Sequence, residues 1–162
     1  MNYVKLKQIK KIYFGCEEIA RILGISLESA RVSGVRLVKG GFLLRIKRNM
    51  YTLKDRWEAL SKQDKFILAN VIQVPSYISL MTALDYYEIT TQIQQNFIES
   101  IAIYRTKEIT VSNSVFHYNK IDKMLYFGFV KEGDFFIAAP KRLLLTHFIL
   151  SRLRDIILIL PQ

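Results

Sequence analysis

The feature that most restricts the fold of this chain is Gly24, a glycine between two short amphipathic stretches. Before it, apolar residues at helical spacing predict a helix over Glu17–Leu23. After it, Ser26 is placed to cap a further helix that runs to Lys39 and ends at the glycine pair beginning at Gly40. A glycine at such a position allows the left-handed backbone of a sharp turn. The order helix, glycine turn and capped helix predicts a helix-turn-helix.

Residues that favour β-structure follow the second helix and contain a short basic run. Phe42–Leu44, the basic segment Arg45–Asn49 and Met50–Leu53 together predict a β-hairpin whose tip is Arg45–Asn49. A lysine-rich amphipathic helix over Val4–Tyr13 is predicted before the helix-turn-helix. A three-helix unit with a hairpin of this kind is typical of a winged helix-turn-helix domain, which we expect between Cys16 and Leu53.

Positive charge is concentrated in the first part of the chain. The protein has 162 residues and a net charge of +10. Residues 1–60 contain 13 Lys or Arg and 5 Asp or Glu, a net charge of +8, and residues 61–162 contain 11 and 9, a net charge of +2. This asymmetry favours a nucleic-acid-binding domain followed by a domain with another role.

The predicted second helix divides into a packing face and an outward face. Ala30, Gly34 and Leu37 recur at three- and four-residue steps and are expected to pack on the preceding helices. Arg31 is placed to make two hydrogen bonds to a guanine, and the other cations are expected at phosphates. The predicted DNA-binding residues are Ser26, Ser29, Arg31, Arg36, Lys39, Arg45, Lys47 and Arg48.

The remainder of the chain predicts an α+β domain over residues 61–162, following a winged-helix domain over residues 1–60. We expect a connecting helix in Lys54–Lys65, helices over Phe66–Val74 and from Ser79 to Tyr86 or Tyr87, and a closing helix from Pro140 to about Leu153. Period-two patterns predict five strands in a small, mainly antiparallel sheet, at Ser100–Arg105, Glu108–Ser112, Val115–Lys120, Leu125–Val130 and Phe135–Ala139.

Residues that would support catalysis, a cofactor or a metal are sparse. Cys16, His117 and His147 are too few and too scattered for a zinc site, and each is expected to be a packed structural residue. No phosphate-binding loop, dinucleotide motif or metalloprotease motif is found, so we expect no enzyme and no cofactor. Lysines interrupt the early apolar runs, and the longest apolar stretch is Ile156–Leu160, so we expect no signal peptide, no membrane partner and a cytoplasmic location.

Two segments beyond the predicted winged helix resemble a known family. Val74–Leu84, with the sequence VPSYISLMTAL, is similar to the segment that opens the second domain of AbiEi-type antitoxins. Phe135–Leu144, with the sequence FFIAAPKRLL, resembles the strand that leads into the next helix of that family. One departure is that relatives often carry an acidic residue early in this helix, where this chain has Thr146 and His147.

The resemblance implies a transcriptional regulator that represses its own promoter, by binding an inverted repeat in double-stranded DNA, and counters a nucleotidyltransferase-like toxin. It transfers no toxin-facing residue. Two other functions stay open at this point. The 51% hydrophobic content would suit a winged-helix adaptor that binds proteins without a toxin partner. A nucleic-acid-processing enzyme would depend on a residue such as His117 or Asp134.

Overall fold

The computed structural model describes residues 2–91 and 95–143 of the chain. They form a mixed α and β structure, as the predicted α+β class requires. The chain divides into two compact units, Met1–Leu68 and Ala69–Gln162. The division falls after Leu68, inside the helix that runs from Lys62 to Ile72, whereas the sequence places the boundary at residue 60.

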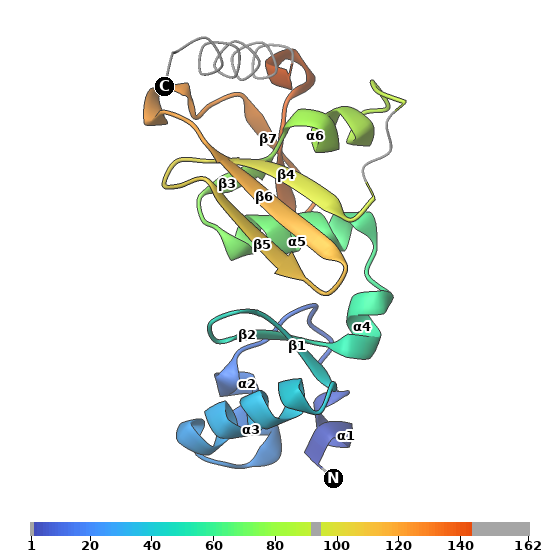
Figure 1. The fold of residues 1–162 in the computed structure, drawn as a ribbon, viewed down its shortest axis with the longest axis vertical. Helices are drawn as coiled ribbons and strands as arrows, with labels where there is room; N and C mark the ends of the chain where they lie inside the picture. The colour runs from blue at the N-terminus through green and yellow to red at the C-terminus, as the bar shows by residue number, and fades with distance from the viewer. Residues whose placement is uncertain (1, 92–94, 144–162) are drawn as a thin grey trace, which may run out of the picture. The chain divides into compact units, whose positions relative to one another are not determined.

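The first unit contains helices followed by a two-stranded antiparallel sheet (Figure 1). The helix before Gly24 and the helix after it are confirmed, as is the hairpin. Its elements are α1 (Asn2–Leu6), α2 (Cys16–Leu23), α3 (Leu27–Lys39), β1 (Leu43–Lys47), β2 (Met50–Leu53) and α4 (Lys54–Glu58). Its core gathers buried side chains from these elements, namely Leu6, Ile9, Phe14, Cys16, Ile19, Ala30, Leu43, Tyr51 and Leu53.

The predicted helix over Val4–Tyr13 is wrong in its second half, since α1 ends at Leu6. The chain leaves the helix through short turns and becomes extended. Phe14 then forms an antiparallel bridge with Tyr51, in which each backbone N–H donates to the other's carbonyl oxygen at 2.9 Å. Because this bridge needs an extended backbone, tertiary pairing overrides the helical spacing of the sequence.

The tip of the hairpin is shorter than predicted. Arg45 and Lys47 belong to β1, and the turn consists of Arg48 and Asn49. Asn49 has a φ of 56°, a left-handed conformation that asparagine tolerates better than most residues. The longer predicted tip is therefore wrong, because the strand continues through the basic residues.

The charged stretch Lys54–Lys65 is two helical segments rather than one. The chain breaks between α4 and α5 (Lys62–Ile72), where Ser61 starts a new helix. The Asp64 backbone N–H donates to Ser61 Oγ at 3.1 Å, and the Ser61 N–H donates to Asp64 Oδ2 at 3.0 Å. This reciprocal cap also explains why α5 begins before the predicted Phe66.

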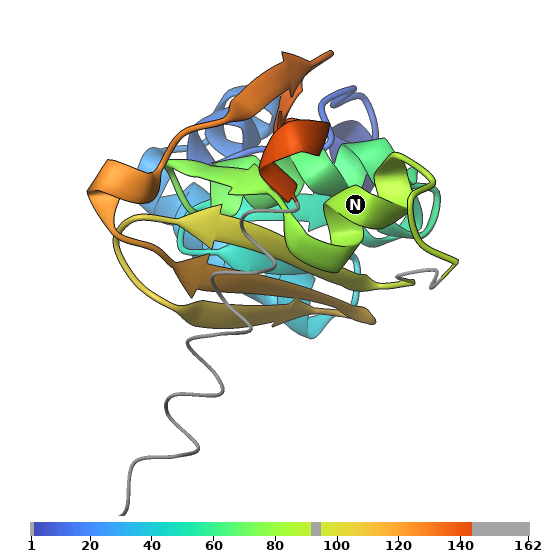
Figure 2. The same cartoon turned by 90° about the horizontal axis from the view of Figure 1, so that it is seen from above.

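The second unit is built on a six-stranded mixed sheet with the order β5-β6-β4-β3-β8-β7. Figure 1 shows β5, β6 and β4 as neighbouring arrows, and Figure 2 shows them from another side. The pairs β4–β6 and β3–β8 are parallel and the other three pairs are antiparallel. The sheet is therefore mixed, with antiparallel pairs in the majority as the sequence predicts. Its strands are β3 (Ser76–Ile78), β4 (Phe97–Ala102), β5 (Lys107–Val111), β6 (Ser114–Lys120), β7 (Phe129–Glu132) and β8 (Phe135–Ala138).

Three strand predictions need correction. The strand predicted at Ser100–Arg105 is three residues too late, since β4 is Phe97–Ala102. The three-residue β3 was missed, although it lies between β4 and β8 with all its residues buried. The predicted strand Leu125–Val130 is wrong in its first half, where Lys123–Leu125 forms a 3₁₀ turn and the strand starts at Phe129. Asp122 causes this turn, because its side chain accepts a hydrogen bond from the Met124 N–H at 2.8 Å.

Helices are tied to the sheet by polar contacts. The buried Tyr118 hydroxyl of β6 donates to the Ala69 carbonyl at 2.7 Å, which joins the end of α5 to the sheet. Helix α6 (Leu80–Tyr86) begins after Ser79, as predicted, and lies along β4. There the Glu99 N–H donates to Thr82 Oγ1 at 2.9 Å. The closing helix starts at Pro140 as predicted, and its course beyond Leu143 lies outside the described residues.

Candidate nucleic-acid interface

A tight glycine turn sets the angle between α2 and α3. Gly24 has φ 64° and ψ 38°, so its backbone is left-handed, and the Ile25 N–H returns to the Ala20 carbonyl at 3.1 Å. Ser26 then caps α3, because its side chain accepts a hydrogen bond from the Ser29 backbone N–H at 3.2 Å. Local sequence chemistry is therefore sufficient to start α3 at Leu27.

The hairpin lies close against α3 because Gly34 has no side chain. A Cβ at this position would lie 3.3 Å from Cζ of Tyr51 and 3.6 Å from Cδ1 of Ile19. Ala30, one turn earlier, is also fully buried. This small-residue face, predicted from the spacing, allows the Tyr51 ring to lie beneath the helix and brings β2 within contact of α3.

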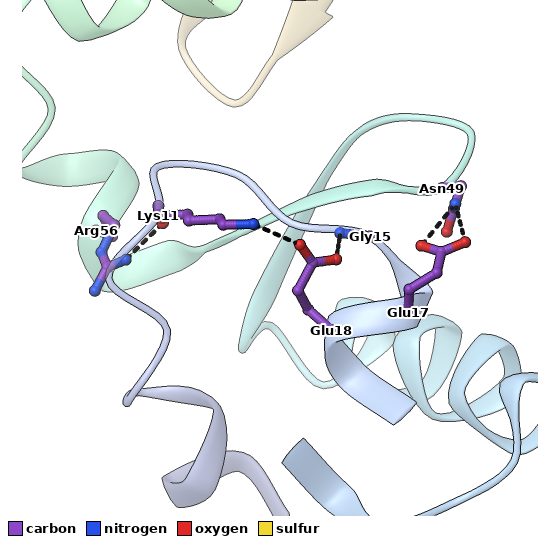
Figure 3. A network of polar contacts seen from close by, with 6 residues as sticks. All are labelled: Lys11, Gly15, Glu17, Glu18, Asn49 and Arg56. Carbon is purple, nitrogen blue, oxygen red and sulfur yellow. Dashed lines mark hydrogen bonds and ion pairs between the residues drawn. The ribbon is translucent and has the colours of Figure 1, made fainter. Parts of the chain in front are cut away.

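Asn49 ties the hairpin turn to the start of α2 (Figure 3). The Cys16 N–H donates to Asn49 Oδ1 at 2.8 Å, and Asn49 Nδ2 donates to the two carboxylate oxygens of Glu17 at 3.0 and 3.2 Å. The bridge between Phe14 and Tyr51 lies two residues away on each segment. The turn is thus held at both its backbone and its side chain, which fixes Arg48 beside the helices.

A second polar network supports the same helix start. Glu18 accepts a hydrogen bond from the Gly15 N–H at 3.0 Å and forms an ion pair with Lys11 at 2.9 Å (Figure 3). The Lys11 ammonium, and to a lesser extent the Gly15 amide, holds the pKa of Glu18 below its ordinary value of 4.5 despite partial burial. Arg56 of α4 donates to the Lys11 carbonyl at 2.6 Å, which anchors the loop before α2.

Helix α3 and the hairpin enclose a groove of about 430 Å³. Three of its lining residues are arginines, Arg31 from α3, Arg45 from β1 and Arg48 from the turn, and all three are exposed. Cations separated by up to 17 positions in the chain therefore meet on one open surface. The other lining residues are Cys16, Val35, Asn49 and Tyr51.

The other predicted residues do not line this groove. Ser26 and Ser29 are engaged with each other at the start of α3, where the two hydroxyls are 3.0 Å apart. Arg36 and Lys39 are exposed along α3, and Lys47 is exposed in β1, two residues after Arg45. The groove thus brings together three of the eight predicted residues, and the other three predicted cations do not line it.

Sequence reasoning missed Cys16, Val35, Asn49 and Tyr51 as parts of the groove. An asparagine next to a run of cations is a turn signal, and the sequence pattern assigns Asn49 only to the tip of the hairpin. No sequence pattern indicates Tyr51 as a lining residue, because its position depends on the space that Gly34 leaves by having no side chain. Burial raises the pKa of the Tyr51 phenol, the neighbouring Cys16 adds to the rise, and Arg45 opposes it. Tyr51 is therefore a neutral hydroxyl at physiological pH.

The groove is suited to a polyanion. Three guanidinium groups with apolar and neutral polar groups between them offer bidentate hydrogen bonds to phosphates or to guanine edges.

Within residues 2–91 and 95–143, no group of three His, Cys, Asp or Glu side chains could hold a metal ion. In the same described ranges, the helices are too short or too polar to span a bilayer.

A scan against models of known protein families finds no match, and a search of curated proteins finds none either.

Proposed function

We propose that this chain is a cytoplasmic DNA-binding transcriptional regulator, with a winged helix-turn-helix in its first unit. In this proposal α3 enters the major groove, and the hairpin formed by β1 and β2 is the wing. The chain represses its own promoter at an inverted repeat, and it performs no catalysis. The observation that carries the proposal is the convergence of Arg31, Arg45 and Arg48 on one open groove.

Three physical properties of the first unit support duplex DNA as the ligand. The groove's arginines come from a helix and from a hairpin that is pinned beside it by Asn49. A helix of 13 residues whose outer face is exposed has the size to lie in a major groove. The net charge of +8 over residues 1–60 supplies long-range attraction to phosphates.

The second part of the proposal is that residues 61–162 act as an antitoxin that counters a nucleotidyltransferase-like toxin. It rests on the likeness of Val74–Leu84 and Phe135–Leu144 to AbiEi-type antitoxins. Val74–Leu84 includes the buried strand β3 and the start of α6, so the similar residues Tyr77 and Ile78 are core residues.

Salt-dependent binding of duplex DNA tests the first part. If about five phosphates are contacted, the logarithm of the binding constant should fall with the logarithm of salt concentration with a slope of roughly −4 to −5. Replacing Arg45, Lys47 and Arg48 by Ala should flatten this slope by about 2 to 3, since each lost phosphate contact removes about 0.9. The measurement is fluorescence anisotropy with labelled promoter DNA over a salt series.

A charge-matched control separates the effect of the hairpin cations from the effect of the overall charge. Lys5, Lys10 and Lys54 are exposed in the same unit and do not line the groove. Their combined replacement by Ala removes the same three charges and should change the slope by less than about 1. Equal flattening by the two triple variants would mean that the binding is non-specific attraction and that the hairpin cations make no phosphate contacts of their own.

Growth assays test the antitoxin part. The reading frame beside the gene for this chain, expressed alone, should arrest growth, and co-expression of the full chain should restore it. A variant that lacks the wing cations should still restore growth but should lose promoter repression. Promoter binding without any neutralising effect would leave a regulator with no toxin. Co-purification of a protein partner without any gel shift would favour the adaptor.

A further inference from the structure

Two valines are exposed on the outward face of α3, within the basic surface. Val32 is 51% exposed and Val35 is 46% exposed, and they are three residues apart on the helix. Val35 lines the groove together with Arg31, and Arg31 directly precedes Val32. An apolar strip therefore lies beside a guanidinium group on the face that the proposed function directs at DNA.

These valines are unfavourable in the isolated protein. Valine is a weaker helix former than arginine or lysine, and an exposed valine contributes little to the core. A valine also offers nothing to a phosphate. Single exposed apolar residues are ordinary, but two neighbours inside a cationic surface indicate an apolar partner atom within an otherwise anionic ligand.

Glu28 indicates which part of the DNA faces this strip. It is exposed in the first turn of α3, one turn before Val32. A carboxylate is repelled by phosphates but accepts hydrogen bonds from cytosine N4 in the major groove. The face that carries Glu28, Val32 and Val35 is therefore suited to base edges, and the cations of the wing are suited to the backbone.

We propose that Val32 and Val35 contact the C5-methyl groups of thymines, next to a guanine that Arg31 contacts. The thymine methyl is the apolar group that base pairs present in the major groove. Residues 31 and 35 are separated by about 6 Å along the helix axis, or roughly two base steps. This inference rests on the proposed function and adds a sequence preference to it, a thymine within about two base pairs of a guanine in each half-site.

Removal of single methyl groups from the DNA tests this contact. The full chain is first used to select duplexes from a random pool, and an enriched duplex is then synthesised with one thymine at a time replaced by deoxyuridine. This replacement removes one methyl group and keeps every hydrogen-bonding group. At the contacted positions we expect binding to weaken about fourfold, the effect of one methyl group no longer buried.

Isosteric variants assign the effect to the two valines. Val32→Thr and Val35→Thr keep the side-chain shape and replace one methyl group by a hydroxyl. At the thymine that the altered side chain contacts, each variant should bind the thymine duplex and the deoxyuridine duplex with affinities within about twofold of each other. Val4→Thr is the matched control, because Val4 is 63% exposed in α1 and does not line the groove. It should retain the wild-type preference for thymine.

The possible results are distinct. Sequence-specific binding that is indifferent to every deoxyuridine replacement would overturn the methyl contact and leave the proposed function intact. A thymine preference that survives in the double variant Val32→Thr/Val35→Thr would also overturn it. A protein that is dimeric as wild type and monomeric as the double variant would show that the valines form an interface between copies. The absence of any duplex binding would refute the proposed function itself, and this inference with it.

Discussion

Asn49 holds the hairpin turn to α2 through its hydrogen bonds with Cys16 and Glu17, here called the Asn49 clasp, and exchanging the roles of Asn49 and Glu17 tests this attachment. In the structure, Asn49 Oδ1 accepts from the Cys16 amide, and Asn49 Nδ2 donates to the Glu17 carboxylate. Asn49→Asp keeps an acceptor for the amide but places a second carboxylate opposite Glu17. The double variant Asn49→Asp/Glu17→Gln restores a donor and an acceptor, with the roles of the two side chains reversed.

The expected magnitude follows from the contacts that change. Asn49→Asp loses the bond at 3.0 Å to Glu17 and replaces it with a like-charge contact, which together cost about 1 to 2 kcal/mol at a solvated site. Asn49→Gly loses the cap on the Cys16 amide as well and should cost about 2 kcal/mol. The left-handed φ of 56° does not penalise glycine. The double variant should recover about 1 kcal/mol of the loss of Asn49→Asp.

Native-state hydrogen exchange at the Cys16 amide is the most direct assay, because the two compact units need not unfold in one step. A change of 1.4 kcal/mol lowers protection about tenfold. Asn49→Asp and Asn49→Gly should therefore show faster exchange at Cys16. If the proposed function holds, the affinity for DNA should also fall, because Arg48 is no longer held beside α2. Wild-type protection in Asn49→Gly, or no recovery in the double variant, would refute the clasp.

Three further outcomes are expected. The depressed pKa of Glu18 stabilises the folded state fully above 4.5, and this contribution is lost as the pH falls through the lowered pKa; an acid titration of Glu18→Gln, compared with the exposed Glu58→Gln, should lack that loss. Gly34→Leu should destabilise the first unit by several kcal/mol in urea unfolding, because a Cβ there would already lie 3.3 Å from an aromatic ring, whereas Gly34→Ala should change stability by about 1 kcal/mol or less, because its helix propensity offsets the contact. Tyr118→Phe should lower the free energy of unfolding by about 1 to 2 kcal/mol through loss of the 2.7 Å bond to a helix carbonyl, whereas the exposed Tyr104→Phe should not.

Sequence reasoning succeeded where the determining interactions are local. Gly24 and Ser26 act on backbone groups within a few residues, so their types alone placed the turn and the start of α3. The alternation of strand residues placed β5, β6 and β8 to within one residue at either end. These features depend on near neighbours in the chain, and the sequence lists such neighbours directly.

Sequence reasoning failed where a distant residue decides the conformation. The helix predicted through Tyr13 ends at Leu6, and the chain then leads to Phe14, which is extended and pairs with Tyr51. The sequence pattern near Phe14 does not indicate that partner. Strand β3 has three residues, too few to show alternation, and it is a strand because β4 and β8 lie on both sides of it. In each case the decisive hydrogen bonds cross a long stretch of chain.

The properties of the candidate groove also divide into those that local sequence sets and those that tertiary structure sets. The sequence by itself determined the positive charge of the first third, the small-residue face of α3 and the presence of cations in the hairpin. Only the tertiary structure decided that Arg31, Arg45 and Arg48 share one groove while Arg36, Lys39 and Lys47 do not line it. The physical reason is that residue type sets charge and local backbone preference, whereas convergence depends on the approach of the hairpin to α3, which the space above Gly34 and the Asn49 clasp set.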